Sequence, residues 1–252
     1  EPPKNLGKTL KHLGPGFILS ASIVGSGELI ATTQLGAKAG FVAMWVILVS
    51  CLVKVAVQLE FGKRAIMTGE TTFASFNSLP GPKLGKANWT VWTWLVLMLI
   101  KFLQVGAIVG LVSVLLNMAF PGLSDFWWLI IVVIAISSIV VSGYYKILEV
   151  LSVSMIGLFT IFTFFSLISL QSTESAISIA NITSGLQFQI PEGAGMAIVV
   201  IGAFGLTGVG GDEIMAYNYW LIEKGYASNT GQNDGTEEWN RRAKGWIKVM
   251  YI

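Results

Sequence analysis

Long apolar stretches divide the chain into six segments, which are separated by shorter polar or charged loops. A helix needs about 20 mostly apolar residues to cross the hydrocarbon core of a bilayer. Lipid offers no hydrogen-bond partner to the backbone, so apolar segments of an open chain must cross as helices. The pattern therefore predicts an all-α, polytopic membrane protein with spans over residues 14–36, 42–66, 89–119, 124–143, 147–171 and 194–222.

The remaining residues are polar or basic. They predict a basic arm over residues 1–13 and a polar loop over 223–245, which we expect to be mobile. Residues 246–252 look like the start of a seventh span. On this interpretation the chain holds about the first six spans of a larger protein.

Composition supports the membrane assignment and gives an orientation. The chain is 54% hydrophobic and 12% charged, whereas soluble domains carry about 25% charged residues. With the N-terminus in the cytoplasm, Lys38 is the one basic residue in an external loop, and the other basic residues outside the membrane lie on the internal side. Cytoplasmic loops are enriched in Lys and Arg, so we expect a cytoplasmic N-terminus, in a prokaryotic inner membrane. The net charge of +2 then reflects topology and does not indicate nucleic-acid binding.

Two of the six segments are interrupted by glycines that stand beside acids. Residues 24–28 read Val-Gly-Ser-Gly-Glu, and residues 209–213 read Val-Gly-Gly-Asp-Glu. A carboxylate at bilayer depth costs a few kcal/mol or more, so it is expected to be functional. Paired glycine interruptions in the two halves of a chain indicate the midplane binding site of a transporter. Close packing of helices is the alternative explanation for the glycines, but it does not require carboxylates.

Unwound backbone and acids together define the candidate site. Unwinding at these glycines would expose carbonyls and amides in mid-membrane, where a ligand, an ion or water must satisfy them. The candidate substrate-binding residues are Glu28, Asp212, Gly25, Met215, Gly27, Gly211 and Glu213.

Two lysines also fall inside predicted spans, Lys54 in the second and Lys101 in the third. Each lysine can extend its ammonium toward the nearer interface. Alternatively it serves as a counter-ion to Glu28, Asp212 or Glu213, or as a built-in cation that replaces a coupling ion.

Several motifs between about Gly14 and Asn218 are similar to those of one known protein family. Residues 14–17 (Gly-Pro-Gly-Phe) open the first segment as in that family, and Gln34 with 36–37 (Gly-Ala) closes it. Gln58 and residues 68–69 (Thr-Gly) match the end of the family's second helix. Residues 215–218, Met-Ala-Tyr-Asn, are similar to the family's Met-Pro-His-Asn signature. With these motifs the chain resembles the Nramp (natural resistance-associated macrophage protein) family of divalent-metal transporters. The resemblance implies a five-plus-five inverted-repeat fold in which helices 1 and 6 are unwound and bind metal between them.

The chain departs from the family pattern at the site itself. The family's Asp-Pro-Gly-Asn motif is replaced by Gly-Ser-Gly-Glu, so its metal-binding Asp position is Gly25 and its Asn position is Glu28. Asp212 stands where the family uses an alanine carbonyl, and Met215 keeps the family's thioether ligand. Tyr217 stands at the family's proton-linked histidine, which leaves proton coupling open, and Asn218 completes the pathway residues.

The resulting metal ligands would be Glu28, Asp212 and Met215. Carboxylate oxygens suit Mg²⁺, Ca²⁺ or Mn²⁺, whereas a thioether favours transition metals such as Mn²⁺ or Fe²⁺. We therefore expect a secondary transporter of Mn²⁺ or a similar cation such as Fe²⁺ or Mg²⁺, working by alternating access. The cation is a substrate, and no cofactor is expected.

Two alternatives stay open at this point. The same fold could carry an amino acid or another small organic ion, whose carboxylate would meet a half-helix N-terminus. The chain could also be a non-transporting membrane sensor or an assembly subunit. An enzyme is not expected, because the sequence offers no nucleophile–base pair, histidine cluster or phosphate loop. The expected partners are the lipid bilayer and a small cation, and the oligomeric state is open.

Overall fold

The computed structural model describes residues 1–252 except 4, 25, 26, 142 and 144, and it does not describe the side chains at 6, 27, 28 and 145. The described residues are mostly helical, with one two-stranded hairpin. The chain divides into two compact units. The first comprises Glu1–Thr71 and Glu149–Ile252, and the second comprises Thr72–Leu148.

Four helical stretches in the described chain are long and apolar enough to cross a membrane: Leu29–Thr68, Trp89–Ala119, Lys146–Leu170 and Met196–Glu223. Two shorter apolar helices, α2 (Gly14–Ile23) and α7 (Asp125–Val141), cover the first part of the first expected segment and most of the fourth. Large apolar side chains on these helices are exposed, with Leu103 at 78% and Met118 at 76%. So much exposed apolar surface is typical of helices that face lipid.

The first unit opens with α1 (Leu6–Leu10) and α2. Pro15 lies in the first turn of α2, where proline is tolerated because the amide there has no intrahelical partner. The helix ends at Ile23, and Val24 is not helical (φ −66°, ψ 89°). The predicted unwinding at Gly25 falls outside the described residues. The chain then forms a π-helical turn, η1 (Gly27–Ala31).

The first unit continues as a series of helices, with the second unit inserted in the sequence between Thr71 and Glu149. They are α3 (Thr32–Ala39), η2 (Gly40–Ala43), α4 (Met44–Thr68), the part of α8 (Tyr145–Leu170) from Glu149 onward, α9 (Ile179–Gly185), α10 (Met196–Leu206) and α11 (Gly211–Glu223). The sixth expected segment is therefore two helices, α10 and α11, with four non-helical residues between them.

The structure differs from expectation over residues 223–245, which we expected to be a mobile loop. This stretch contains α12 (Tyr226–Thr230) and most of α13 (Glu237–Met250). The Thr236 side chain caps α13 by accepting a hydrogen bond from the Trp239 amide at 3.1 Å. Trp239 and Trp246 are both 2% exposed, on a helix that packs against α4. The apolar stripe of α13 is narrow, and its many charged residues made the segment look like a loop.

Close packing of α4, α11 and α13 forms the main core of the first unit. The buried side chains there include Leu221, Tyr217 and Trp246. A side chain at Gly62 of α4 would overlap the sulfur of Met250 and press on Leu221 and Tyr217. Glycine at this position therefore lets the three helices approach one another.

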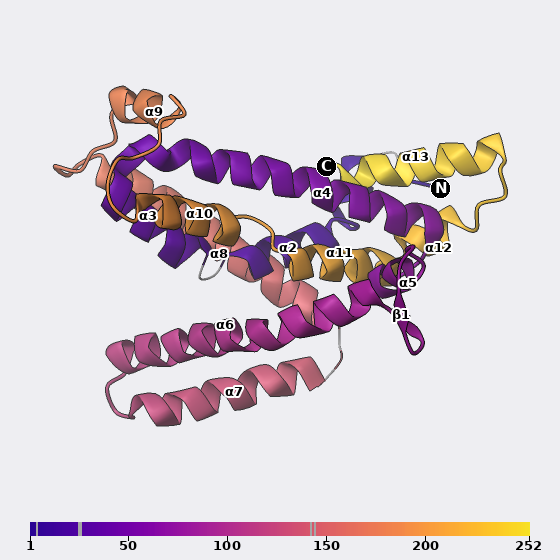
Figure 1. Ribbon diagram of the computed structural model, residues 1–252, viewed down its shortest axis with the longest axis horizontal. Helices are drawn as coiled ribbons and strands as arrows, with labels where there is room; N and C mark the ends of the chain where they lie inside the picture. Colours follow the sequence, from indigo (N-terminus) through magenta and orange to yellow (C-terminus); the bar gives the residue numbers. More distant parts are fainter. Residues whose placement is uncertain (4, 25–26, 142, 144) are drawn as a thin grey trace. The chain divides into compact units, whose positions relative to one another are not determined.

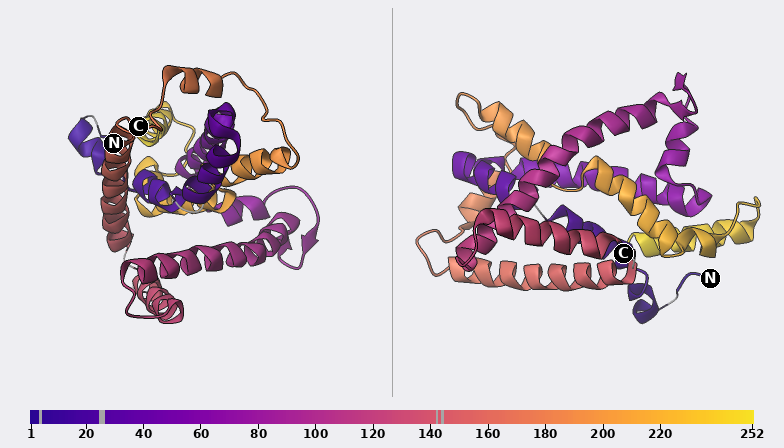
Figure 2. Two further views of the ribbon diagram at one scale, coloured as in Figure 1. Left: turned by 90° about the vertical axis from the view of Figure 1, so that its left-hand side faces the viewer. Right: turned by 90° about the horizontal axis from the view of Figure 1, so that it is seen from below.

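The second unit is built on two long helices. α5 (Thr72–Asn77) leads through the hairpin of β1 (Lys83–Leu84) and β2 (Ala87–Asn88) into α6 (Trp89–Ala119). Asn88, fully buried, caps α6 by accepting from the Thr90 amide at 3.1 Å, and it donates to the Leu79 carbonyl at 2.6 Å. α6 and α7 then pack side by side (Figure 1, Figure 2).

Candidate functional site

The two interrupted segments lie against each other in the first unit. α2 packs against α11, whereas η1 and α3 pack against α10 (Figure 1). In the first segment, α2 comes before the interruption and η1 after it. In the second segment, α10 comes before the interruption and α11 after it. The two segments therefore run antiparallel, and their interruptions meet at the same level.

The C-terminal end of α10 is held by two side chains of α4. Lys54 Nζ donates to the backbone carbonyls of Phe204, Gly205 and Thr207 at 3.0, 2.9 and 2.6 Å. The Ser50 hydroxyl lies 2.6 Å from the Phe204 carbonyl and 3.1 Å from that of Thr207. An apolar helix end therefore has two polar side chains of a neighbouring helix directed at its open carbonyls.

Every fourth residue of α4 faces the interrupted segment, and these residues form one row: Val46, Ser50, Lys54, Gln58 and Gly62. Val46 shares a buried cluster with Ala203 of α10. Ser50 and Lys54 bind the end of α10, as described above. Gln58 hydrogen-bonds the Tyr217 side chain on α11, and Gly62 lies against the same helix. Residues four apart make a continuous ridge on a helix, so the α4 row spans the interruption and supports both half-helices.

The N-terminal end of α11 carries its own acids. Gly210 is the N-cap residue (φ −85°, ψ 169°), and Asp212 and Glu213 lie in the first turn. The Glu213 carboxylate turns back over Gly210, because Oε2 occupies the space that a side chain at Gly210 would need. A helix N-terminus carries partial positive charge and stabilises carboxylates. Met215, which is 8% exposed, follows Asp212 by one turn.

The turn between the two half-helices depends on Gly208. Its φ of +72° lies in the left-handed region that side chains disfavour. A Cβ at this position would also lie 3.2 Å from Cys51 Sγ and 3.4 Å from Cys51 Cα. The close approach of the turn to α4 and its backbone conformation therefore both require glycine.

Buried polar groups continue along α11 beyond the acids. Tyr217 is 3% and Asn218 2% exposed. Asn218 Oδ1 is buried and makes no hydrogen bond to the part of the chain that the structure describes. A cavity of about 370 Å³ opens between α2, α4 and α11, and its lining includes Ser20, Gln58 and Tyr217. Polar side chains thus extend from the interruption to a cavity beside α2.

An ion pair joins the other ends of these helices. Lys224, the C-cap residue of α11, lies with its Nζ 2.5 Å from Glu149 Oε1 on α8, and both side chains are about four-fifths buried. Glu149 also fills the space where a side chain at Gly14, the first residue of α2, would lie. The pair therefore connects α8 and α11 at the beginning of α2.

His12 lies next to this ion pair in an aromatic cluster. Its ring is 4.9 Å from that of Trp246 and 6.1 Å from that of Tyr226, edge to face. The Tyr226 hydroxyl donates to the His12 carbonyl at 2.9 Å. Burial, with a smaller contribution from the Lys224 ammonium, lowers the pKa of His12 below its ordinary value of 6.5.

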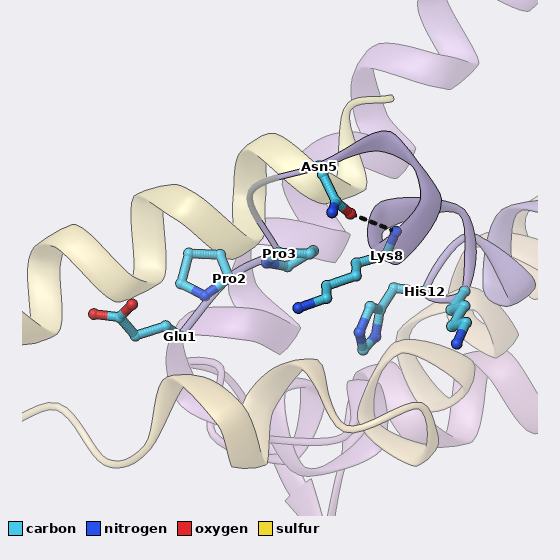
Figure 3. A pocket seen from close by; sticks show the side chains of 7 residues that line it. Glu1, Pro2, Pro3, Asn5, Lys8 and His12 are labelled. Carbon is cyan, nitrogen blue, oxygen red and sulfur yellow. Dashed lines mark hydrogen bonds between the residues drawn. The ribbon is translucent and has the colours of Figure 1, made fainter.

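A larger pocket, of about 540 Å³, lies at the N-terminal arm (Figure 3). Asn5 caps α1 by accepting from the Lys8 amide at 2.9 Å, and Pro2 packs against Gly245 of α13. Lys8 and Lys11 line the pocket. Glu1 also lines it, and among the described residues none of the predicted cation ligands does.

Seven of the predicted site residues lie on two neighbouring helices of the first unit. Gly211, Asp212, Glu213, Met215, Tyr217 and Asn218 lie on α11, and Lys54 lies on α4 beside it. Gly25 is outside the described residues, and Gly27 and Glu28 are described only as the backbone of η1. Lys101 lies on α6 in the second unit. No group of three or more His, Cys, Asp or Glu side chains able to hold a metal occurs within the described residues.

Three residues of the site were missed from the sequence: Ser50, Glu149 and Lys224. Ser50 lies four residues before Lys54, so helical spacing alone puts both on one face of the second span. Glu149 is an acid inside the predicted fifth span, the same signal that identified Glu28. Lys224 follows the sixth span by two residues and carried no distinguishing signal.

Comparison with known proteins gives one match. The family described as natural resistance-associated macrophage protein-like (Nramp) matches residues 16–237. The matched range contains both interrupted segments, the α4 row and the acids of α11. Neither a curated protein nor a solved structure matches the chain.

Proposed function

The chain belongs to the Nramp family of divalent-metal transporters, and from this membership we propose that it is a secondary transporter that binds a divalent cation between two interrupted helices. Membership of the family and the apolar helices make it an integral membrane protein and a transporter, not an enzyme. The proposal adds the position of the site and the kind of cation.

The observation that carries the proposal is the antiparallel contact of the interrupted segments, with α2 against α11 and η1 against α10. This contact brings the backbone that carries Glu28 next to the half-helix that precedes Asp212. Inverted-repeat transporters bind substrate between two discontinuous helices at such a level. The same contact is the support for an inverted-repeat fold with both helices unwound.

We assign the cation to Glu28, Asp212 and Met215, with the Gly25 carbonyl as a further ligand. Gly27, Gly211 and Glu213 would line the site. Two carboxylates and one thioether favour Mn²⁺, with Fe²⁺ next and Mg²⁺ last, because a thioether is a poor ligand for hard cations. The burial of Met215, two residues after Glu213, supports this assignment.

The buried polar groups on α11 suggest the route of the cation. An acceptor buried without a partner calls for an explanation, and Asn218 Oδ1 is one within the described chain. Tyr217 and Gln58 line the cavity beside α2. In alternating access, this cavity would widen and connect the site to one side of the membrane. We place that side, with the N-terminus, in the cytoplasm, because the lysines and arginines of the loops gather there.

Any proton coupling would depend on the carboxylates of the site. Tyr217 stands at the family's proton-linked histidine, and tyrosine does not change charge near neutral pH. Glu28, Asp212 and Glu213 are the groups within or beside the site that can bind a proton as the metal leaves.

Flux into proteoliposomes tests the proposal. Mn²⁺, Fe²⁺ and Mg²⁺ uptake should be measured for the wild type, Glu28→Ala, Asp212→Ala and the exposed control Glu192→Gln. We expect saturable Mn²⁺ uptake that both site variants abolish and the control retains. Normal uptake in both site variants would contradict the proposed position of the site. The absence of any metal uptake by the wild type would contradict the proposed function. A thermal-shift screen with amino acids beside the metals then tests the amino-acid alternative.

A further inference from the structure

The end of α10 presents several carbonyls that the helix itself cannot satisfy. The last four carbonyls of any helix lack an intrahelical partner, and lipid offers none. The Ala203 carbonyl accepts from the backbone amide and the hydroxyl of Thr207, at 2.9 and 2.8 Å. The carbonyls of Phe204, Gly205 and Thr207 converge instead on α4.

One ammonium group serves all three converging carbonyls. Lys54 Nζ lies within 3.0 Å of each oxygen, and an ammonium has three N–H donors, the same number. The group stands at the negative end of the α10 dipole, where a cation is favoured. The Ser50 hydroxyl supplements two of the three carbonyls.

Several carbonyl oxygens around one point are also the ligand set that proteins offer to a dehydrated monovalent metal ion. We propose that Lys54 is a tethered cation that fills such a carbonyl site at the second interruption. The protein therefore needs no exchangeable Na⁺ or K⁺ at this position. Removal of the lysine side chain converts the site into one that binds a small monovalent cation from solution.

The tether also has a positional consequence. An exchangeable ion leaves the site in each cycle, whereas Lys54 stays attached to α4. The Lys54 ammonium therefore keeps the end of α10 on the α4 row, with a fixed positive charge near the acids of α11. Lys54 acts in this way through the backbone of α10, whichever substrate the protein carries.

The test uses the purified full chain in detergent and follows its melting temperature, so it does not depend on transport. Lys54→Ala should be titrated with methylammonium, Na⁺ and K⁺ chlorides, with choline chloride holding the ionic strength constant. We expect saturable rises in melting temperature of about 3 °C or more for this variant. Tetramethylammonium has the same charge as methylammonium but no N–H donor, so it should not raise the melting temperature of this variant.

Two controls separate the proposal from general salt effects. Ser50→Ala removes a neutral donor from the same carbonyls, so it should melt at a lower temperature without gaining a response to cations. The wild type should melt at the same temperature in Na⁺, K⁺ and choline chlorides.

Three results would overturn the proposal. The first is Lys54→Ala responding to cations no more than the wild type does. The second is a saturable response of the wild type to Na⁺ or K⁺. The third concerns a Lys54→Ala variant that yields no folded protein and is then expressed and purified in methylammonium. Recovery of folded protein there supports the proposal, and continued failure to fold overturns it.

Discussion

The two helix ends that meet at the second interruption are satisfied by different parts of the protein. The carbonyl end of α10 receives its donors from α4, through Lys54 and Ser50. The amide end of α11 carries Asp212 and Glu213 in its own first turn, next to the other interrupted segment. One end thus meets a cation that belongs to the fold, and the other presents negative charge.

This difference suggests that the two helix ends, separated by one short turn, have different roles. The carbonyl end is part of the scaffold, because the side chains that hold it are fixed to a neighbouring helix. The acids of the amide end would hold the transported cation. Changes at the carbonyl end should therefore lower stability, whereas changes at the amide end should lower transport.

The largest expected effect is that of Asp212→Asn, which keeps the shape of the side chain and removes its charge. We expect Mn²⁺ uptake to fall about 100-fold, since the loss of even an outer-shell partner of a metal ligand costs up to that much. The free energy of unfolding should change by less than about 1 kcal/mol. Uptake in proteoliposomes and urea unfolding in detergent measure the two quantities. A strongly destabilised variant that still transports would reverse the assignment of the two ends.

Gly208→Ala should destabilise the turn between the two ends by about 1–3 kcal/mol, because its φ of +72° is unfavourable for alanine. Part of the loss should come from the contact with Cys51, 3.2 Å from the added Cβ. Combination with Cys51→Ala separates the two causes, since it relieves the contact and leaves the backbone strain. Denaturant unfolding of the three variants provides the measurement. If the double variant regains the free energy of unfolding that Gly208→Ala loses, the contact with Cys51 is the sole reason for the glycine.

Ser50→Ala should lower the free energy of unfolding by about 1 kcal/mol, the typical net contribution of a hydrogen bond. The loss is limited because Lys54 still donates to the same carbonyls. Mn²⁺ uptake per folded molecule should match the wild type. Val46→Ala, one turn earlier in the α4 row, is the matched control for lost packing. Reduced uptake by Ser50→Ala alone would place the carbonyl end in the transport mechanism.

The smallest effect concerns His12, which is remote in sequence from both ends and sets the background for any pH experiment. Its pKa is lowered below 6.5 by burial and by Lys224. The unfolded chain therefore binds more protons in the interval below pH 6.5, and stability should fall as the pH falls through that interval. Melting temperature against pH should show this slope in the wild type, and His12→Gln should flatten it. If uptake keeps its pH dependence in His12→Gln, that dependence reports the acids of the site.

The helices were predictable because lipid imposes a strong rule on sequence. A span needs about 20 mostly apolar residues, and each of the four long apolar stretches of the described chain overlaps a predicted segment. The first of them, Leu29–Thr68, also includes the end of the first predicted segment and the loop after it. α13 escaped prediction because it is not apolar all round. Its buried face rests on Trp239 and Trp246, and charged residues occupy the rest of the helix.

The candidate site was chosen from the sequence by its side chains, and its contacts were not predictable. Asp212 and Lys54 stood out because charge is rare within a span. The sequence left Lys54 with several roles, from counter-ion to tethered cation. Its hydrogen-bond acceptors lie about 150 positions further along the chain, and no residue type distinguishes them.

By itself, the sequence determined that the chain is helical, that it belongs in a membrane, and that two of its segments combine glycines with acids. The tertiary structure decided which lysine meets which helix end. The reason is that every residue carries the same backbone carbonyl, so a carbonyl site has no signature in the sequence. It arises only when α10 ends beside α4, at the level where Ser50 and Lys54 face it.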